Sequence, residues 1–218
     1  MKKIFLVALM SVFATTMFAQ GITTNTPKSW GYIYMEYNPG IISVDGGKWD
    51  VDNFDGISLG YNGNFRIAKN VPLYLGTGVG LQVTVAEDEE STYILGSSYK
   101  TKYTFGMVSV KVPFNFGYML SFPNAKIDVF PNTGLDFRFN TWGEAKRETN
   151  GNSSKVDVFS KDDMGDYAFN RVQIGAHIGV NARFWKHLVV GFSYQFDFNE
   201  IAEKTHVYQG NLMVGYSF

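Results

Sequence analysis

Apolar and polar residues alternate with a period of two along seven segments of the chain, each about ten residues long. In residues 73–85 the odd positions are mainly Leu and Val, whereas the even positions are mainly Gly, Gln and Thr. The other six segments are residues 55–66, 107–118, 127–140, 171–184, 188–198 and 206–218. This alternation predicts β-strands that each have one apolar and one polar face.

Residues 30–37 supply an eighth strand, although both of its faces carry apolar residues. We place Glu36 on the polar face, which puts Ile33, Met35 and Tyr37 on the apolar face. Pro113 and Pro131 interrupt two of the other strands. Because proline removes a donor from the hydrogen-bond ladder, we expect β-bulges there.

Long and short connections alternate between these strands. The long ones are residues 38–54, 86–101 and 141–170, and the short ones are residues 67–72, 121–125 and 185–187. Short periplasmic turns, long extracellular loops and an even strand number are typical of outer-membrane barrels. The sequence therefore predicts an all-β fold, an eight-stranded antiparallel up-and-down transmembrane β-barrel. An even strand number also places both mature termini in the periplasm.

The composition of the two faces indicates which one meets lipid. The polar face is rich in Gly, Ser, Asn and Gln and contains few Lys or Glu residues, so it suits a crowded lumen better than a solvated surface. The apolar face carries Phe, Tyr, Leu and Val on nearly every strand, too much volume for the interior of eight strands. We therefore expect the apolar face to contact lipid rather than the core of a soluble barrel.

The N-terminus has the features of a secretory signal peptide. Lys2 and Lys3 form a basic region, Ile4 to Phe13 an apolar region, and Ala19 offers a cleavage site. The apolar region is too short to span a bilayer as a helix. We expect residues 1–19 to be a signal peptide that is cleaved, residues 20–218 to be the barrel domain, and the protein to reside in the outer membrane of a Gram-negative cell.

Charge and cysteine content agree with export to a membrane. The chain has 19 Lys and Arg against 20 Asp and Glu; losing Lys2 and Lys3 with the signal peptide leaves 17 basic residues and a net charge of −3. Such a balance argues against a nucleic-acid partner. There is no Cys, so no disulfide stabilises the exported chain.

The chain ends NLMVGYSF, with four apolar residues on one face of the last strand: Leu212, Val214, Tyr216 and Phe218. This ending resembles the C-terminal insertion signal of outer-membrane barrels. The resemblance implies the barrel-insertion machinery and periplasmic chaperones as partners, besides outer-membrane lipids and lipopolysaccharide. The mature chain resembles the small eight-stranded barrel superfamily (OmpA-like and OmpX-like barrels). The segments VPFNFGYML and DVFPNTGLDFRF look most like the PorT-like "outer membrane protein beta-barrel domain" group.

We predict a polar network in the lumen that is nearly balanced in charge. Its expected members are Glu36, Arg66, Lys111, Asp128, Asp136, Arg138, Arg171, His177, Arg183, Gln195 and Asp197. Buried charges need partners, so this network is expected to plug the barrel. The register expected across the turn at 121–125 brings Lys111 within reach of Asp136 as an ion pair. The three-residue turn at 185–187 places Phe184 opposite Leu188 and hence His177 opposite Gln195.

The sequence shows no catalytic motif, no metal-ligand spacing and no cofactor-binding loop. We expect a non-enzymatic outer-membrane barrel with a structural, adhesive or envelope-assembly role exerted through its extracellular loops, whose partner the sequence does not identify. The PorT-like resemblance implies an alternative, an accessory factor in protein secretion. A further alternative is a lipid A-modifying enzyme that uses His206 with Glu203 or Glu200. Another is a narrow pore. The acidic run from Glu87 to Glu90 is expected in a solvated loop.

Overall fold

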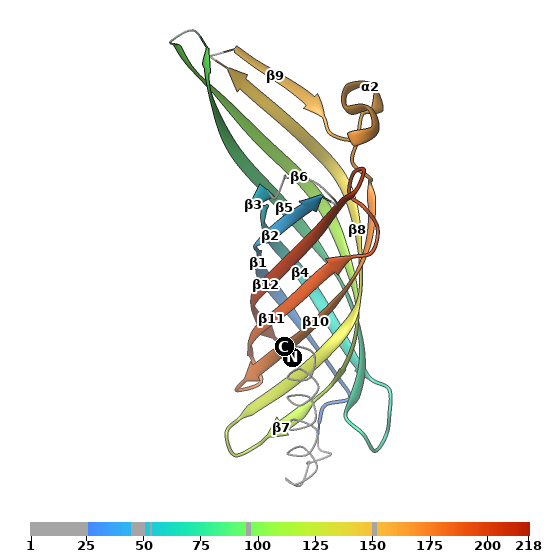
Figure 1. Ribbon diagram of the computed structural model, residues 1–218. Coiled ribbons are helices and arrows are strands. Elements are labelled where there is room, and N and C mark those ends of the chain that lie inside the picture. Colours follow the sequence, from blue (N-terminus) through green and yellow to red (C-terminus); the bar gives the residue numbers. More distant parts are fainter. Residues whose placement is uncertain (1–25, 45–50, 53, 95–96, 150–151) are drawn as a thin grey trace, which may run out of the picture.

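A computed structural model describes residues 26–44, 51–52, 54–94, 97–149 and 152–218. Eight strands form a ring in this part of the chain (Figure 1). Their bounds are β1 Ser29–Asn38, β4 Asp55–Arg66, β5 Leu73–Ile94, β6 Ser97–Tyr118, β8 Ile127–Thr149, β10 Val172–Phe184, β11 Leu188–Asp197 and β12 Thr205–Ser217. The predicted signal peptide, residues 1–19, lies outside the described residues, so its cleavage stays a prediction.

The ring is closed by the pairing of its first and last strands. β1 pairs with β12 antiparallel, from Tyr32 opposite Ser217 to Tyr37 opposite Leu212. Elsewhere in the ring, each strand pairs antiparallel with the next ring strand along the chain. The predicted eight-stranded up-and-down barrel is therefore confirmed. Closure matters because an open sheet edge would leave backbone groups without hydrogen-bond partners in lipid.

The apolar face of the strands points outward, as the sequence predicts. Leu59 is 67% exposed, whereas its neighbour Ser58 is 1% exposed. On β1, Ile33, Met35 and Tyr37 face outward and Glu36 faces the lumen. The exposed apolar side chains form a belt around the ring, which is what a lipid-facing surface requires.

Three of the strands continue far beyond the ring, in segments expected to be loops. β5 and β6 stay paired as far as Ile94 and Ser97, and β8 continues beside β6 to Thr149. β9 (Asn152–Asp157) adds a further strand along β8. We call these parts of β5, β6, β8 and β9 the projecting sheet, and the end of the barrel that bears it the loop end (Figure 1). The opposite end, with the short connections, is the turn end.

The expected acidic loop is part of this sheet. Residues 87–90 belong to β5 and pair with residues 101–104 of β6. Lys102 lies 2.9 Å from Glu87, and Lys100 lies 4.0 Å from Glu89. The hydrogen bond from Lys102 to Glu87 raises the pKa of this lysine. This run is therefore a strand rather than a loop, and opposite charges lie along its ladder.

Shorter elements complete the connections. The first long connection contains β2 (Gly40–Val44), which pairs with β12, and β3 (Val51–Asp52). β7 (Leu120–Phe122) extends the β6–β8 hairpin at the turn end. α2 (Lys161–Met164) and the 3₁₀ turn η1 (Gly165–Tyr167) follow β9. Among the described residues, no helix has the length and apolar character needed to cross a membrane.

Two apolar clusters fill the two ends of the barrel. The turn-end cluster consists of Trp30, Tyr32, Tyr34, Tyr74, Met119, Phe130, Val189 and Met213. The loop-end cluster consists of Ile42, Phe54, Ala86, Met107, Ile201 and Val207, with Phe105, Phe159 and Phe169 packed against it. Trp30 is 5% exposed and therefore lies inside the barrel, not in a rim of aromatic residues facing lipid. Apolar residues thus close the lumen above and below its polar centre.

The outward belt generates a stability prediction. Val79→Arg and Ile178→Arg place a charge at positions that are 52% and 48% exposed on the lipid side. Each should lower the free energy of unfolding in lipid vesicles by about 2–4 kcal/mol if the position is near the bilayer midplane. Denaturant titration followed by tryptophan fluorescence measures this loss. Val79→Leu is the matched control and should be nearly neutral; an equal loss for both Val79 variants would contradict lipid exposure.

Candidate luminal site

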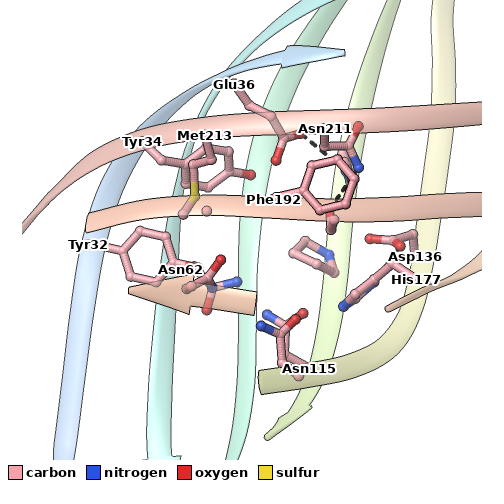
Figure 2. A pocket seen from close by; sticks show the side chains of 16 residues that line it. Tyr32, Tyr34, Glu36, Asn62, Asn115, Asp136, His177, Phe192, Asn211 and Met213 are labelled. Carbon is pink, nitrogen blue, oxygen red and sulfur yellow. Dashed lines mark hydrogen bonds and ion pairs between the residues drawn. The ribbon is translucent and has the colours of Figure 1, made fainter. Parts of the chain in front are cut away.

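The centre of the lumen holds two buried pairs of ionisable side chains. Lys111 Nζ of β6 lies 3.4 Å from Glu36 Oε1 of β1, across the barrel rather than along one ladder. His177 Nδ1 of β10 lies 2.6 Å from Asp136 Oδ2 of β8. All four side chains are at most 10% exposed. Figure 2 shows Glu36, Asp136 and His177 around the small cavity between these pairs, with Tyr32 and Tyr34 on its far side.

Short polar side chains connect Glu36 to the neighbouring strands. Asn38 donates one hydrogen bond to Glu36 (2.6 Å) and one to Asn211 of β12 (2.8 Å). Ser58 of β4 donates to Asn38 (2.5 Å), and Asn211 donates to Ser193 of β11 (3.0 Å). Asn38 is not among the predicted members of the network, because the expected first strand ends at Tyr37. Extending the alternation by one residue places Asn38 on the same luminal face as Glu36, opposite to the face of Tyr37.

A second charged level lies nearer the loop end. Arg138 forms a buried ion pair with Asp197 and donates a hydrogen bond to Gln209 (2.8 Å). Gln195 donates to Asp197 (3.4 Å). Arg138 is 1% exposed, so its charge depends on these partners.

A third level lies at the turn end. Arg183 of β10 donates to Asp128 of β8 through both Nε (3.1 Å) and Nη2 (2.8 Å). Ser121 donates to the other oxygen of Asp128 (2.5 Å). The guanidinium group also lies 4.9 Å from the ring centroid of Trp30. Cation–π contact and ion pairing together hold Arg183 between the polar centre and the turn-end cluster.

The predicted register is right for one pair and wrong for the other. His177 lies opposite Gln195 and Phe184 opposite Leu188, as predicted. Lys111 lies opposite Arg138, and Pro113 lies opposite Asp136. The expected ion pair of Lys111 with Asp136 is therefore not formed. Instead, Lys111 pairs with Glu36, and Asp136 pairs with His177.

The cause of this error is the position of the turn between β6 and β8. β7 extends the hairpin, and the chain reverses at residues 123–126, later than the expected turn at residues 121–125. The prolines do not shift the register. The register between β6 and β8 shifts between Val108 and Ser109, near Thr141 on the opposite strand. A hairpin's register is set by its turn, so a misplaced turn moves every partner.

Two predicted members lie outside the lumen. Arg66 is half-buried at the turn end, where its guanidinium donates to the backbone oxygens of Ala68 (2.9 Å) and Lys69 (2.7 Å). Arg171 precedes β10 at the loop end and is exposed. In both cases the long side chain reaches groups beyond the end of its strand, so the alternation no longer decides where it points.

The C-terminal residues of the expected insertion signal all face outward. Leu212, Val214, Tyr216 and Phe218 are 46–73% exposed. Their position on the lipid side is compatible with recognition by another protein during insertion, which stays a prediction.

The luminal site is built as a structural plug. The cavity in Figure 2 has a volume of about 50 Å³, enough for a few water molecules. Gly134 shows how closely the wall packs, because a Cβ there would lie 2.9 Å from His177 Cε1 and also collide with the backbone oxygen of Phe114. No group of three or more His, Cys, Asp or Glu side chains suited to a metal ion occurs among the described residues.

Comparison with known families identifies the class of protein. Residues 21–203 match the model of the outer membrane protein beta-barrel domain. The chain therefore belongs to this family of integral outer-membrane β-barrels. The PorT-like subgroup stays a prediction. No curated protein sequence matches the chain significantly.

Solved structures with a similar fold come from several bacteria. Ail of Yersinia pestis in complex with the heparin analogue sucrose octasulfate is 17% identical, with 88% of this chain and 100% of that chain covered and a TM-score of 0.47. Neisserial surface protein A is 13% identical over 86% and 95% of the two chains, with a TM-score of 0.41. A major outer membrane protein of Thermus thermophilus is 14% identical over 86% and 99%, with a TM-score of 0.42.

The central pair generates a coupling prediction. Lys111→Met leaves Glu36 buried without its cation and should cost about 3–5 kcal/mol of unfolding free energy. Glu36→Gln should also destabilise the barrel, and the double variant should cost at least about 1 kcal/mol less than the sum of the two. Denaturant unfolding of all four proteins measures the coupling. Additive effects would contradict a direct ion pair.

The two apolar clusters generate a conductance prediction. Because they close the lumen on both sides of the charged levels, the purified protein should give no discrete current steps in planar bilayers. A general porin, reconstituted in the same way, supplies the positive control. Reproducible steps of constant size would mean that an ion path crosses the clusters.

Proposed function

We propose that this protein is a non-enzymatic surface protein whose barrel serves as an anchor and whose projecting sheet makes contacts outside the cell. The observation that carries the proposal is the contrast between the two regions. The lumen is filled with paired charges and apolar clusters, whereas the projecting sheet is open to its surroundings. An adhesive role uses the exposed region and needs no path through the barrel.

The projecting sheet has features suited to binding another macromolecule. Its outward face carries rows of opposite charges, including the pairs Lys102–Glu87 (2.9 Å), Lys146–Glu148 (2.9 Å) and Lys155–Glu144 (2.7 Å). Beyond the end of β4, the upper part of β5 forms one border of the sheet, and β9 forms the other. Such borders offer backbone groups to an added strand.

The proposal includes an orientation in which the loop end faces outward. Short connections at one end and a large structured region at the other are typical of periplasmic and extracellular sides, respectively. With this orientation both mature termini are periplasmic. Protease treatment of intact cells tests it, since cleavage in the projecting sheet is expected and cleavage at the turn end is not.

Two alternatives from the sequence stay open to experiment. A secretion factor of the PorT-like kind should retain periplasmic partners in a pull-down from cross-linked cells. A lipid A-modifying enzyme should change the mass spectrum of lipid A when the gene is deleted. We expect an unchanged lipid A spectrum.

Shortening the projecting sheet tests adhesion directly. Residues 89–102 are replaced by Asn-Gly, which joins Asp88 to Tyr103 at positions that face each other. Cells that display the shortened protein should lose aggregation and attachment to surfaces coated with extracellular-matrix proteins. The barrel should still shift its gel mobility on boiling, because the ring is unchanged.

The control variant replaces the turn at residues 123–126 with a Gly/Ser turn of the same length. It should fold and adhere like the unmodified protein. Equal adhesion of the shortened and unmodified proteins, or no adhesion by the unmodified protein, would overturn the proposed role.

A further inference from the structure

A pocket opens on the outside of the barrel where β8 changes its neighbour. Along the ring, β8 pairs with β10 up to Phe139 opposite Val172. Further on, the same edge pairs with β9, beginning at Glu144 opposite Asp157. Between these two ladders lies a notch with a volume of about 240 Å³. We call it the rim pocket; its lining includes Thr141, Trp142, Glu144, Lys155, Asp157 and Arg171.

The rim pocket lies directly above the lipid-facing belt. Phe139 and Val172, the last pair of the β8–β10 ladder, are 43% and 45% exposed on the outer surface. Thr141 and Arg171 follow them toward the loop end. A site at this height meets the headgroups of the membrane leaflet rather than its hydrocarbon.

The pocket contains a cation, Arg171, for which the described residues show no ion pair. Arg171 lies with its guanidinium carbon 4.4 Å from the ring centroid of Phe159 and donates to the backbone oxygen of Thr141 (3.4 Å). Among the described residues, no carboxylate forms an ion pair with it. The ring and the backbone oxygen hold the guanidinium without forming an ion pair, so it can receive an anionic oxygen, for which a guanidinium group is well shaped.

The other walls fit a sugar. Trp142 faces outward with 51% of its surface exposed, and an indole face suits the C–H groups of a sugar ring. Glu144 and Asp157 supply acceptors for hydroxyl groups, while Lys155, 2.7 Å from Glu144, limits their negative charge. A purely anionic ligand would not need these carboxylates, and a neutral sugar would not need Arg171.

We propose that the rim pocket binds the phosphorylated sugar headgroup of a glycolipid in the outer leaflet. Arg171 holds the phosphate, Trp142 stacks on a sugar ring, and Glu144 and Asp157 accept hydrogen bonds from its hydroxyl groups. The assignment rests on the orientation proposed above, because only then does the loop-end rim contact the outer leaflet. The pocket then fixes the barrel to particular lipids beneath the projecting sheet.

Native mass spectrometry of the detergent-solubilised protein tests this assignment. The probes are diphosphorylated lipid A, dephosphorylated lipid A and phosphatidylglycerol, each titrated separately. The unmodified protein should prefer diphosphorylated lipid A to both other lipids. Arg171→Gln should weaken that binding by about tenfold and remove the dependence on phosphate, since a charge-assisted hydrogen bond is lost. Trp142→Ala should weaken binding of both forms of lipid A alike.

The turn end offers matched controls. Trp185 is 62% exposed and is followed by the exposed Lys186, so the opposite rim also carries a tryptophan and a cationic side chain. In detergent both rims are equally accessible, and Trp185→Ala and Lys186→Gln should leave the preference for diphosphorylated lipid A unchanged. Equal affinity of the unmodified protein for all three lipids, or equal losses for the variants of both rims, would overturn the proposal. Because the measurement does not depend on orientation, failure of the orientation alone would show in the protease test and not here.

Discussion

The whole structure depends on the need to satisfy every backbone hydrogen bond in a medium that offers none. In lipid, an unpaired N–H or C=O group costs several kcal/mol, so a sheet that crosses the membrane must close on itself. The pairing of β1 with β12 achieves this closure. Once the ring is closed, each strand has one side toward lipid and one toward the lumen, and the alternation of residues follows.

A closed ring of eight strands creates a second constraint inside. Its lumen is narrow, and side chains must fill it. Here the filling is layered: an apolar cluster lies at each end, and charged levels lie between them. Buried charges stabilise such a core only when each has its partner, and the pairs Lys111–Glu36, Arg138–Asp197 and Arg183–Asp128 meet this condition. Of these pairs, Lys111–Glu36 joins strands that are not neighbours in the ring, whereas Arg183–Asp128 joins the adjacent strands β10 and β8.

The sequence predicts best what one strand or one tight turn decides. The outward direction of Leu59 follows from local alternation, and the pairing of His177 with Gln195 follows from a three-residue turn. The pair of Lys111 with Glu36 joins strands that are not neighbours in the ring, so no local rule predicts it. The projecting sheet is not predicted from the sequence because apolar and polar residues do not alternate there, and charged residues such as Glu89 suit a strand and a loop equally well.

A filled lumen moves any function to the outside of the barrel. Two exterior regions differ from a plain ring of strands: the projecting sheet and the rim pocket at its base. Both arise from the same event, the continuation of β8 past the start of β10, which leaves an edge that β9 covers only from Glu144 onward. The extension thus supplies the surface that we propose for binding and, where its partner changes, the rim pocket that we propose for a lipid headgroup. A lipid held in that notch by Arg171 would restrain the base of the sheet and so reduce the entropy that the sheet loses when it binds a partner.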